Sequence, residues 1–482
     1  MSSFFNKLSK SASPQVKAST AYTICSVLQR CLSFITLPIF SRMLTTEEYG
    51  LSTVYSSTMA LLIIFTSLQL PYGSFATAMT KFENDRDNYI TSINYVCTGL
   101  TILFYIIYIP FHAFWNKYLD IPTLLIIVMG IEMLMTTSLN LWMGKQRFEY
   151  KYKGVVLVIL SSSILGTIIA IITTYFSNDK GITKVLAYSI VAISVGIVPY
   201  VKSMIHLRDG LKLRYIKYAL SFNLPLIPYY LSQMIFNQSD RLMINSMCGR
   251  SDAAMYGVTY NLAIILTFVI NAVNNSYVPW FYGKLKENKF EANKKVSFAI
   301  SALMAVLLLG VISLAPEIIY VLAGKKYESA VWVVPPVAMS LIFLLYTQFS
   351  INVEFFFEEK KAIVFGSILS AVVNIVLNYF FIKEFGFVAA AYTTLLSYIL
   401  FALCNYISMV KICRKRYIDA NIYNTKKLLI LAFVFCFIGF GFMALYNMSV
   451  VRYCVIAAVL LIGLINIKKI MVVVKEYVSV FR

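Results

Sequence analysis

Long apolar stretches separated by short polar links run through the whole chain. A helix of roughly 20 apolar residues is long enough to cross the hydrocarbon core of a bilayer. Fourteen stretches of this kind are predicted, near residues 18–42, 49–71, 89–111, 121–143, 154–176, 182–201, 218–240, 253–278, 296–315, 331–353, 362–382, 387–410, 428–446 and 452–473. The links between them are too short to hold an extramembrane domain. The pattern therefore predicts an all-α polytopic membrane protein with about 14 transmembrane helices.

The composition agrees with a membrane protein, and the charge distribution gives its topology. Hydrophobic residues make up 59% of the chain and charged residues 13%, about half the share of ~25% in soluble domains. A net charge of +20 would by itself suggest a nucleic-acid partner. With a cytoplasmic N-terminus, however, 31 of the 42 Lys and Arg residues lie in or beside inner segments and only 10 in outer loops. This asymmetry is the positive-inside rule, so we expect both termini in the cytoplasm and no nucleic-acid partner.

The sequence also repeats itself. Three pairs of matching positions recur at offsets of 207, 208 and 209 residues: Tyr49-Gly50 with Tyr256-Gly257, Pro71 with Pro279, and Phe148-Glu149 with Phe357-Glu358. An offset of six spans, which is an even number, predicts two parallel six-helix lobes related by an axis along the membrane normal. We predict an N-lobe at residues 1–210, a C-lobe at 211–415 and two further helices at 416–482.

Two ionisable residues lie near the middle of predicted spans in the first half. Arg30 is roughly 18 Å along the first helix and Glu132 roughly 16 Å along the fourth, at 1.5 Å per residue. A charge at the bilayer centre is costly and persists only with a partner or in a wet cavity. Arg30 and Glu132 therefore form either an ion pair that holds the bundle together, or a cationic site for an anionic substrate. In the second case Glu132 tunes the site or carries a proton.

A second charged pair, Asp240 and Arg241, lies near the outer end of the seventh span. One interpretation is an interfacial pair whose side chains reach water, as long charged side chains do near a membrane surface. The alternative gives Arg241 a role in substrate binding and Asp240 a role in ion coupling or charge pairing.

Amide side chains are concentrated in the second half of the chain. They are Asn271, Asn274 and Asn275 on one predicted helix face, Asn374 and Asn378 on another, and Gln348. The spacings i, i+3 and i+4 place the members of each group on one side of a helix. Such amides either join helices by hydrogen bonds or form a polar wall that binds sugar hydroxyls.

Motifs for chemical catalysis are missing from the sequence. It contains no Walker A sequence, nucleophile elbow or zinc-binding helix, which are the motifs of ATP hydrolysis, acyl transfer and zinc catalysis. Its eight Cys residues form no CxxC pair. The two His residues, His112 and His206, fall in predicted loops. We therefore expect a protein that is not an enzyme and has no catalytic residues, metal or cofactor.

The chain resembles the polysaccharide-transport branch, with its Wzx-type O-antigen repeat-unit flippases, of the multidrug/oligosaccharidyl-lipid/polysaccharide exporter superfamily. The resemblance covers about residues 15–410 and rests on three segments: Leu37-Pro38-Ile39-Phe40-Ser41-Arg42-Met43-Leu44-Thr45-Thr46-Glu47-Glu48-Tyr49-Gly50, Asp240-Arg241-Leu242-Met243-Ile244 and Ala254-Met255-Tyr256-Gly257. It implies a bacterial inner-membrane protein with two lobes that open to one side at a time. Members of the superfamily often have twelve transmembrane helices. In its fourteen predicted helices this chain resembles the lipid II flippases.

The resemblance further implies the transport of a polyprenyl-pyrophosphate-linked glycan from the cytoplasmic to the outer leaflet. Arg30 is the residue that best fits a contact with the pyrophosphate, and Asn271, Asn274, Asn275, Asn374 and Gln348 fit contacts with the sugars. Membrane lipids, a polysaccharide polymerase and glycosyltransferases are the partners it implies. Two alternatives stay open: a multidrug/cation antiporter of the same fold, and a membrane enzyme that acts on lipid-linked sugars.

Overall fold

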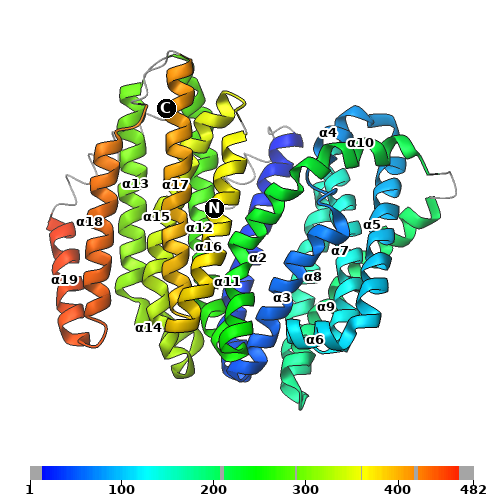
Figure 1. Cartoon of the computed structure of the whole chain (residues 1–482), viewed down its shortest axis with the longest axis horizontal. Coiled ribbons are helices and arrows are strands. Elements are labelled where there is room, and N and C mark those ends of the chain that lie inside the picture. Colours follow the sequence, from blue (N-terminus) through cyan, green and yellow to red (C-terminus); the bar gives the residue numbers. More distant parts are fainter. Residues whose placement is uncertain (1–13, 207–210, 288–289, 360, 417–421, 466–482) are drawn as a thin grey trace, which may run out of the picture. The chain divides into compact units, whose positions relative to one another are not determined.

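The computed structural model describes residues 14–206, 211–287, 290–359, 361–416 and 422–465. Every regular element within these ranges is a helix, and 12 of the helices are long and apolar enough to cross a membrane. Figure 1 traces them in the colours of chain order. The prediction of an all-α multi-pass membrane protein is confirmed. The fourteenth predicted span, 452–473, is described only as far as residue 465, and its remainder lies outside the described residues.

The chain packs as two compact units, Met1–Ala254 and Met255–Arg482. The first unit contains α2 (Pro14–Met43), α3 (Thr46–Ser67), α4 (Phe75–Lys81), α5 (Arg86–Tyr108), α6 (His112–Leu119), α7 (Thr123–Phe148), α8 (Tyr152–Phe176), α9 (Lys180–His206), α10 (Leu213–Asn223) and α11 (Ile227–Cys248). In it α7 and α8 both pack on α9, α2 packs on α8, and α3 packs on α11. The division into lobes at residue 210 comes from the sequence repeat and stays a prediction.

The seventh predicted span, 218–240, is wrong as a continuous helix. The structure interrupts it with a short 3-10 helix at Leu224–Leu226, so that α10 ends at Asn223 and α11 begins at Ile227. Pro225 and Pro228 explain the break, because proline has no amide hydrogen and its ring clashes with the preceding helical turn. Pro228 is tolerated in the first turn of α11, where its missing donor would be unpaired in any case.

Local hydrogen bonds explain the motif that precedes Tyr49-Gly50. The Thr45 side chain accepts from the amide of Glu48 at 3.2 Å, and the Glu48 carboxylate accepts from the amide of Thr45 at 2.7 Å. This reciprocal pair is a capping box, which pairs backbone donors that a helix start leaves free. Gly50 is needed for a different reason: a Cβ atom there would lie 2.1 Å from the carbonyl oxygen of Arg250. The motif therefore starts α3 and allows the close approach of the segment that starts α12.

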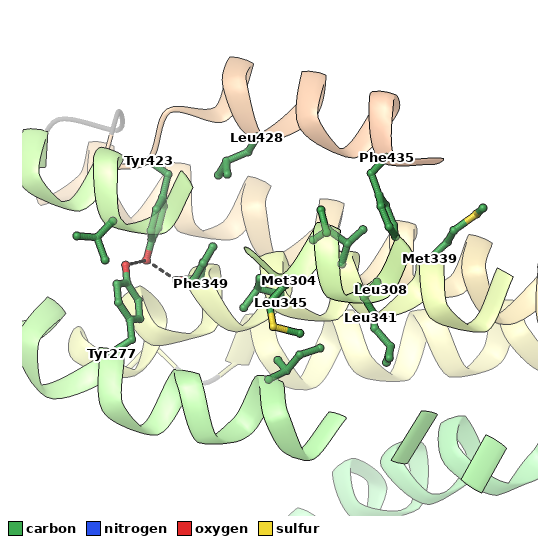
Figure 2. Close-up of a cluster of buried hydrophobic side chains, with 14 of the residues drawn as sticks. Tyr277, Met304, Leu308, Met339, Leu341, Leu345, Phe349, Tyr423, Leu428 and Phe435 are labelled. Atoms are coloured by element: carbon green, nitrogen blue, oxygen red, sulfur yellow. Dashed lines mark hydrogen bonds between the residues drawn. The ribbon is translucent and has the colours of Figure 1, made fainter. Parts of the chain in front are cut away.

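The second unit contains most of α12 (Arg250–Lys286), then α13 (Phe290–Ser313), α14 (Ala315–Ala323), α15 (Val334–Phe356), α16 (Lys361–Phe385), α17 (Ala389–Lys415), α18 (Thr425–Ala444) and α19 (Ser449–Ile465). The span that ends with α15 is the most deeply covered, with 78% of its apolar window buried. α15 packs against α17, α13 and α18, and Figure 2 shows the resulting core, with Met304, Leu345 and Phe435 contributed from three different helices.

Polar contacts hold the segment before α18 against this core. The Tyr423 hydroxyl donates to the Phe349 carbonyl at 2.9 Å (Figure 2), and the Tyr277 hydroxyl donates to Asn293 Oδ1 at 2.5 Å. The Asn293 amide nitrogen donates in turn to the Ile422 carbonyl at 2.9 Å. Because buried polar groups are costly when unpaired, this network fixes the start of α18 on α12, α13 and α15.

α19 is fixed to α14 by an ion pair. Arg452, only 2% exposed, pairs with Glu317, and the Tyr453 hydroxyl donates to the same carboxylate. The guanidinium also lies over the rings of Tyr446 and Tyr453, at 5.7 and 5.2 Å. The last described helix is therefore held on the second unit by charge as well as by apolar packing.

Candidate functional site

Arg30 lies on α2 with its side chain exposed. Only 22% of the apolar window of the span that carries it, Ala21–Met43, is buried. The preceding residue, Gln29, donates to Ser163 Oγ on α8 at 2.9 Å, so this part of α2 has a polar contact with its neighbour. A charged side chain in a membrane span is costly unless it meets water or a polar or charged partner. The predicted role of Arg30 in binding an anionic group stays a prediction.

Glu132, on α7, is held by two hydroxyl groups. Its Oε2 atom accepts from the Tyr55 hydroxyl of α3 at 2.7 Å and from Ser189 Oγ of α9 at 2.6 Å. No ion pair joins Glu132 to a basic side chain among the described residues. The structure thus brings together Glu132, Tyr55 and Ser189, and it does not pair Glu132 with Arg30. The carboxylate joins three helices of the first unit at one point.

Lys184 is a buried cation that the sequence pattern did not single out. It lies on α9, is 9% exposed, and donates to Ser52 Oγ of α3 at 2.9 Å. Its ammonium group also lies over the rings of Phe40 and Tyr49, at 4.9 and 4.2 Å. Aromatic rings attract a cation through their quadrupole. The signal in the sequence was a basic residue inside the predicted span 182–201, which the charge count assigned to an outer loop.

Asp240 and Arg241 are buried, at 3% and 8% exposure. The expectation of an interfacial pair that reaches water is therefore wrong. Arg241 donates to Gln238 Oε1 at 2.9 Å, and Ser57 on α3 donates to the same oxygen at 3.0 Å. The cause is packing of α11 on α3, which hydropathy does not report. These contacts form a polar seam between two helices of the first unit.

The amides of the second unit fall into two groups. Gln348 and Asn352 of α15 donate to Asn271 and Asn274 of α12 at 2.7 and 2.8 Å. Asn271 is exposed, as is Asn275 one turn along the same helix. This group combines interhelical bonds with accessible amides, so both of the predicted roles are compatible with it.

Asn374 and Asn378 form the other group, and both are buried, at 1% and 0% exposure. The Asn378 amide nitrogen donates to Asn374 Oδ1 at 3.2 Å, and the Thr393 hydroxyl donates to Asn378 Oδ1. These contacts join α16 to α17. In this conformation the pair stabilises helix packing and presents little polar surface.

An apolar groove runs along the second unit between α15, α17 and α18. It has a volume of about 220 Å³ and is lined mainly by aromatic and aliphatic side chains, among them Phe343, Tyr406, Leu403 and Leu429. A groove of this size and character suits part of a hydrocarbon chain.

Comparison with known proteins agrees with this architecture. A family model described as polysaccharide biosynthesis protein matches residues 16–283. An Lsg-locus protein of Haemophilus influenzae is 22% identical over 375 residues, which is 74% of this chain and 89% of the relative. An uncharacterized membrane protein of the same organism is 23% identical over 372 residues, or 74% and 88%.

Two solved structures share the fold at low sequence identity. The lipid II flippase MurJ in an inward closed conformation has a TM-score of 0.66 and 14% identity, covering 92% of this chain and 99% of that one. A multidrug resistance MATE family transporter of the MOP superfamily, in an inward-facing conformation, has a TM-score of 0.63 and 14% identity, covering 83% and 98%. The family model spans more than half of the sequence, and the chain therefore belongs to the polysaccharide biosynthesis protein family, with the fold of the MOP superfamily transporters.

Proposed function

We propose that this protein is a flippase that moves a polyprenyl-pyrophosphate-linked oligosaccharide repeat unit from the cytoplasmic to the outer leaflet of a bacterial inner membrane. It would work by alternating access and supply the assembly of a surface polysaccharide such as O-antigen or capsule. Both termini would lie in the cytoplasm, as the distribution of basic residues predicts. A polysaccharide polymerase and glycosyltransferases would then act after and before it on the same lipid-linked sugar.

The observation that carries the proposal is the exposed guanidinium of Arg30 within a membrane span. A pyrophosphate cannot enter hydrocarbon without a compensating charge or hydrogen bonds, and a guanidinium matches two phosphate oxygens at once. Family membership indicates that the substrate contains a saccharide. Arg30 is the group that would bind the pyrophosphate joining this saccharide to the lipid.

The second unit offers groups for the rest of the substrate. The exposed amides of Asn271 and Asn275 fit the hydroxyl groups of a sugar. The apolar groove between α15, α17 and α18 fits part of a polyprenyl tail. A relative of the same fold is a lipid II flippase, which supports a lipid-linked substrate over a soluble one.

The membrane potential would favour this direction of transport. A negative charge that moves outward across an inside-negative membrane gains about 2.3 kcal/mol per 100 mV. The potential alone therefore gives a pyrophosphate headgroup a driving force, whether or not an ion is also exchanged.

The test uses purified protein in proteoliposomes that contain a fluorescent polyprenyl-pyrophosphate-linked oligosaccharide, with outward movement measured by a membrane-impermeant quencher. Arg30→Ala should abolish flipping while the protein stays folded, and Arg30→Lys should retain part of it, because a lysine keeps the charge but loses the two-pronged geometry. Arg42→Ala, at the exposed end of the same helix, is the matched control and should flip normally.

Normal flipping by Arg30→Ala would remove Arg30 from the site. Absence of flipping by the wild-type protein, together with export of organic cations, would instead favour the multidrug antiporter.

A further inference from the structure

Glu354 is a fully buried acid in the last turn of α15. Its side chain is 0% exposed, and neither carboxyl oxygen has a hydrogen-bond partner among the described residues. No basic side chain in the described part of the chain is within ion-pair distance of it. Glu132, the acid within α7 of the first unit, accepts two hydrogen bonds from hydroxyl groups. Glu354 differs from Glu132 in accepting no hydrogen bond on its carboxyl oxygens.

The surroundings of Glu354 are weakly polar and uncharged. The Ser408 hydroxyl of α17 lies beside the carboxyl group without meeting hydrogen-bond geometry. Asn405 lies three residues before Ser408 and hence on the same face of α17. It is also buried, and its Oδ1 atom is likewise without a partner. The packed helices α15 and α17 thus each contain a buried side chain with polar atoms that lack a hydrogen-bond partner, Glu354 on α15 and Asn405 on α17.

The charged groups of the helices packed against α15 lie elsewhere. On α17 they are Lys411, Arg414 and Lys415, all exposed, and on α18 Lys426 and Lys427, also exposed. On α13, Lys294 pairs with Glu291 at 2.7 Å, and Lys295 is exposed. Lys415 lies 3.4 Å from Glu359. None of these cations neutralises Glu354.

The burial of Glu354 therefore favours the protonated form of its carboxyl group in this conformation. An isolated ionised carboxylate in a low-dielectric interior is so unfavourable that the group takes up a proton instead. Even the neutral acid is destabilising when its polar atoms stay unpaired. By the offset of 209 residues in the predicted repeat, which pairs Phe357 with Phe148, Glu354 corresponds to Lys145, a basic residue that forms an ion pair with Asp87 at 2.6 Å. A destabilising acid without a packing role indicates a functional one.

We propose that Glu354 is a proton-binding site of the second unit, which is occupied in this conformation and releases its proton when α15 and α17 rearrange during transport. The step is a simple protonation: a proton from water binds one carboxylate oxygen, the buried acid is neutral, and the proton returns to water once the site is hydrated. Ser408 and Asn405 are the groups able to hydrogen-bond the carboxylate after such a rearrangement. This role rests on the proposed flippase function and adds proton exchange as a second source of energy.

The protonated site is tested without any transport assay. Infrared difference spectroscopy of the purified wild-type protein and of Glu354→Gln should show that the carbonyl band of a buried carboxylic acid disappears in the variant. Glu358→Gln changes an exposed acid four residues away and should leave the band unchanged. If the spectra of the wild type and Glu354→Gln coincide in this band, the acid is not protonated and the proposal fails.

Coupling is tested in proteoliposomes with an imposed pH gradient, acidic on the outer side. The gradient should accelerate outward flipping by the wild type and by Glu358→Gln, whereas the rate of Glu354→Gln should be the same with and without it. A gradient response retained by Glu354→Gln would overturn the coupling role. If the wild type does not flip lipid at all, the flippase proposal fails, and the infrared result still decides the proton site. Should Glu354→Gln not reach the membrane, Glu354→Leu serves the same comparison, since an apolar residue of similar size removes the unpaired oxygens.

Discussion

The ion pair between Glu317 and Arg452 makes a quantitative prediction about how α19 is held. Glu317→Gln keeps the size of the side chain but removes its negative charge, so the buried guanidinium loses its counterion. Removal of one partner from a buried ion pair typically costs about 3–5 kcal/mol. Two features reduce this value in the present case: the Glu317 side chain is 33% exposed, and the rings of Tyr446 and Tyr453 continue to attract the cation. We therefore expect a loss of about 2–4 kcal/mol.

The assay is thermal unfolding of the purified protein in detergent, followed by intrinsic fluorescence at one fixed heating rate. A unit of about 200 residues shifts its midpoint by roughly 2–4 °C per kcal/mol, so Glu317→Gln should lower the midpoint by roughly 4–16 °C. Glu359→Gln is the matched control, because its partner Lys415 is 73% exposed and exposed pairs contribute at most about 1 kcal/mol.

The double variant Glu317→Gln/Arg452→Met decides the cause. It removes both charges and should recover most of the lost stability, because the penalty comes from the unpaired cation. If Glu317→Gln melts with the wild type, or if the double variant is no more stable than Glu317→Gln, the ion pair does not hold α19 and the reasoning is refuted.

Two further predictions concern packing and buried hydrogen bonds. Gly50→Ala should lower stability by about 1–3 kcal/mol, since the new methyl group would clash with the Arg250 carbonyl. Gly99→Ala is the control and should leave stability unchanged, because the space around Gly99 is open. Equal melting midpoints for the two variants would contradict the close approach of Gly50 to Arg250. Asn293→Ala should cost about 1–3 kcal/mol, because it leaves the Ile422 carbonyl without its partner and the Tyr277 hydroxyl with only the Tyr423 hydroxyl, 3.4 Å away. Protease sensitivity near the start of α18 should rise in this variant, and an unchanged digestion pattern would argue against the network.

The sequence predicts the architecture well because hydropathy directly measures what a bilayer selects. Helices Thr123–Phe148 and Tyr152–Phe176, for example, follow from apolar windows alone. The interruption at Leu224–Leu226 does not follow, because a hydropathy window averages over the two prolines and reports only an apolar stretch. The physical cause of the interruption is the missing amide hydrogens of the two prolines. The prolines are visible in the sequence, but a hydropathy average does not record the loss of a hydrogen-bond donor.

The candidate site was predictable only in part. Arg30 is visible from sequence because a charge inside an apolar span is conspicuous. The burial of Asp240 and the aromatic contacts of Lys184 depend on which helices pack together, and one sequence does not contain that information. Glu354 lies just beyond the predicted end of its span, 331–353, where a charged residue is ordinary. Only the packing of α17 over that end makes its burial apparent.

The proline-flanked break between α10 and α11 has a mechanical consequence. Bending an intact helix ruptures main-chain hydrogen bonds, whereas at Pro225 and Pro228 the corresponding donors never existed. A change of angle at this joint therefore meets less resistance than one anywhere inside α11. A rocking motion that bends this stretch of chain would therefore bend it at the joint between α10 and α11. Replacing Pro225 and Pro228 with alanine would stiffen the joint and slow such a motion without changing a ligand-binding group.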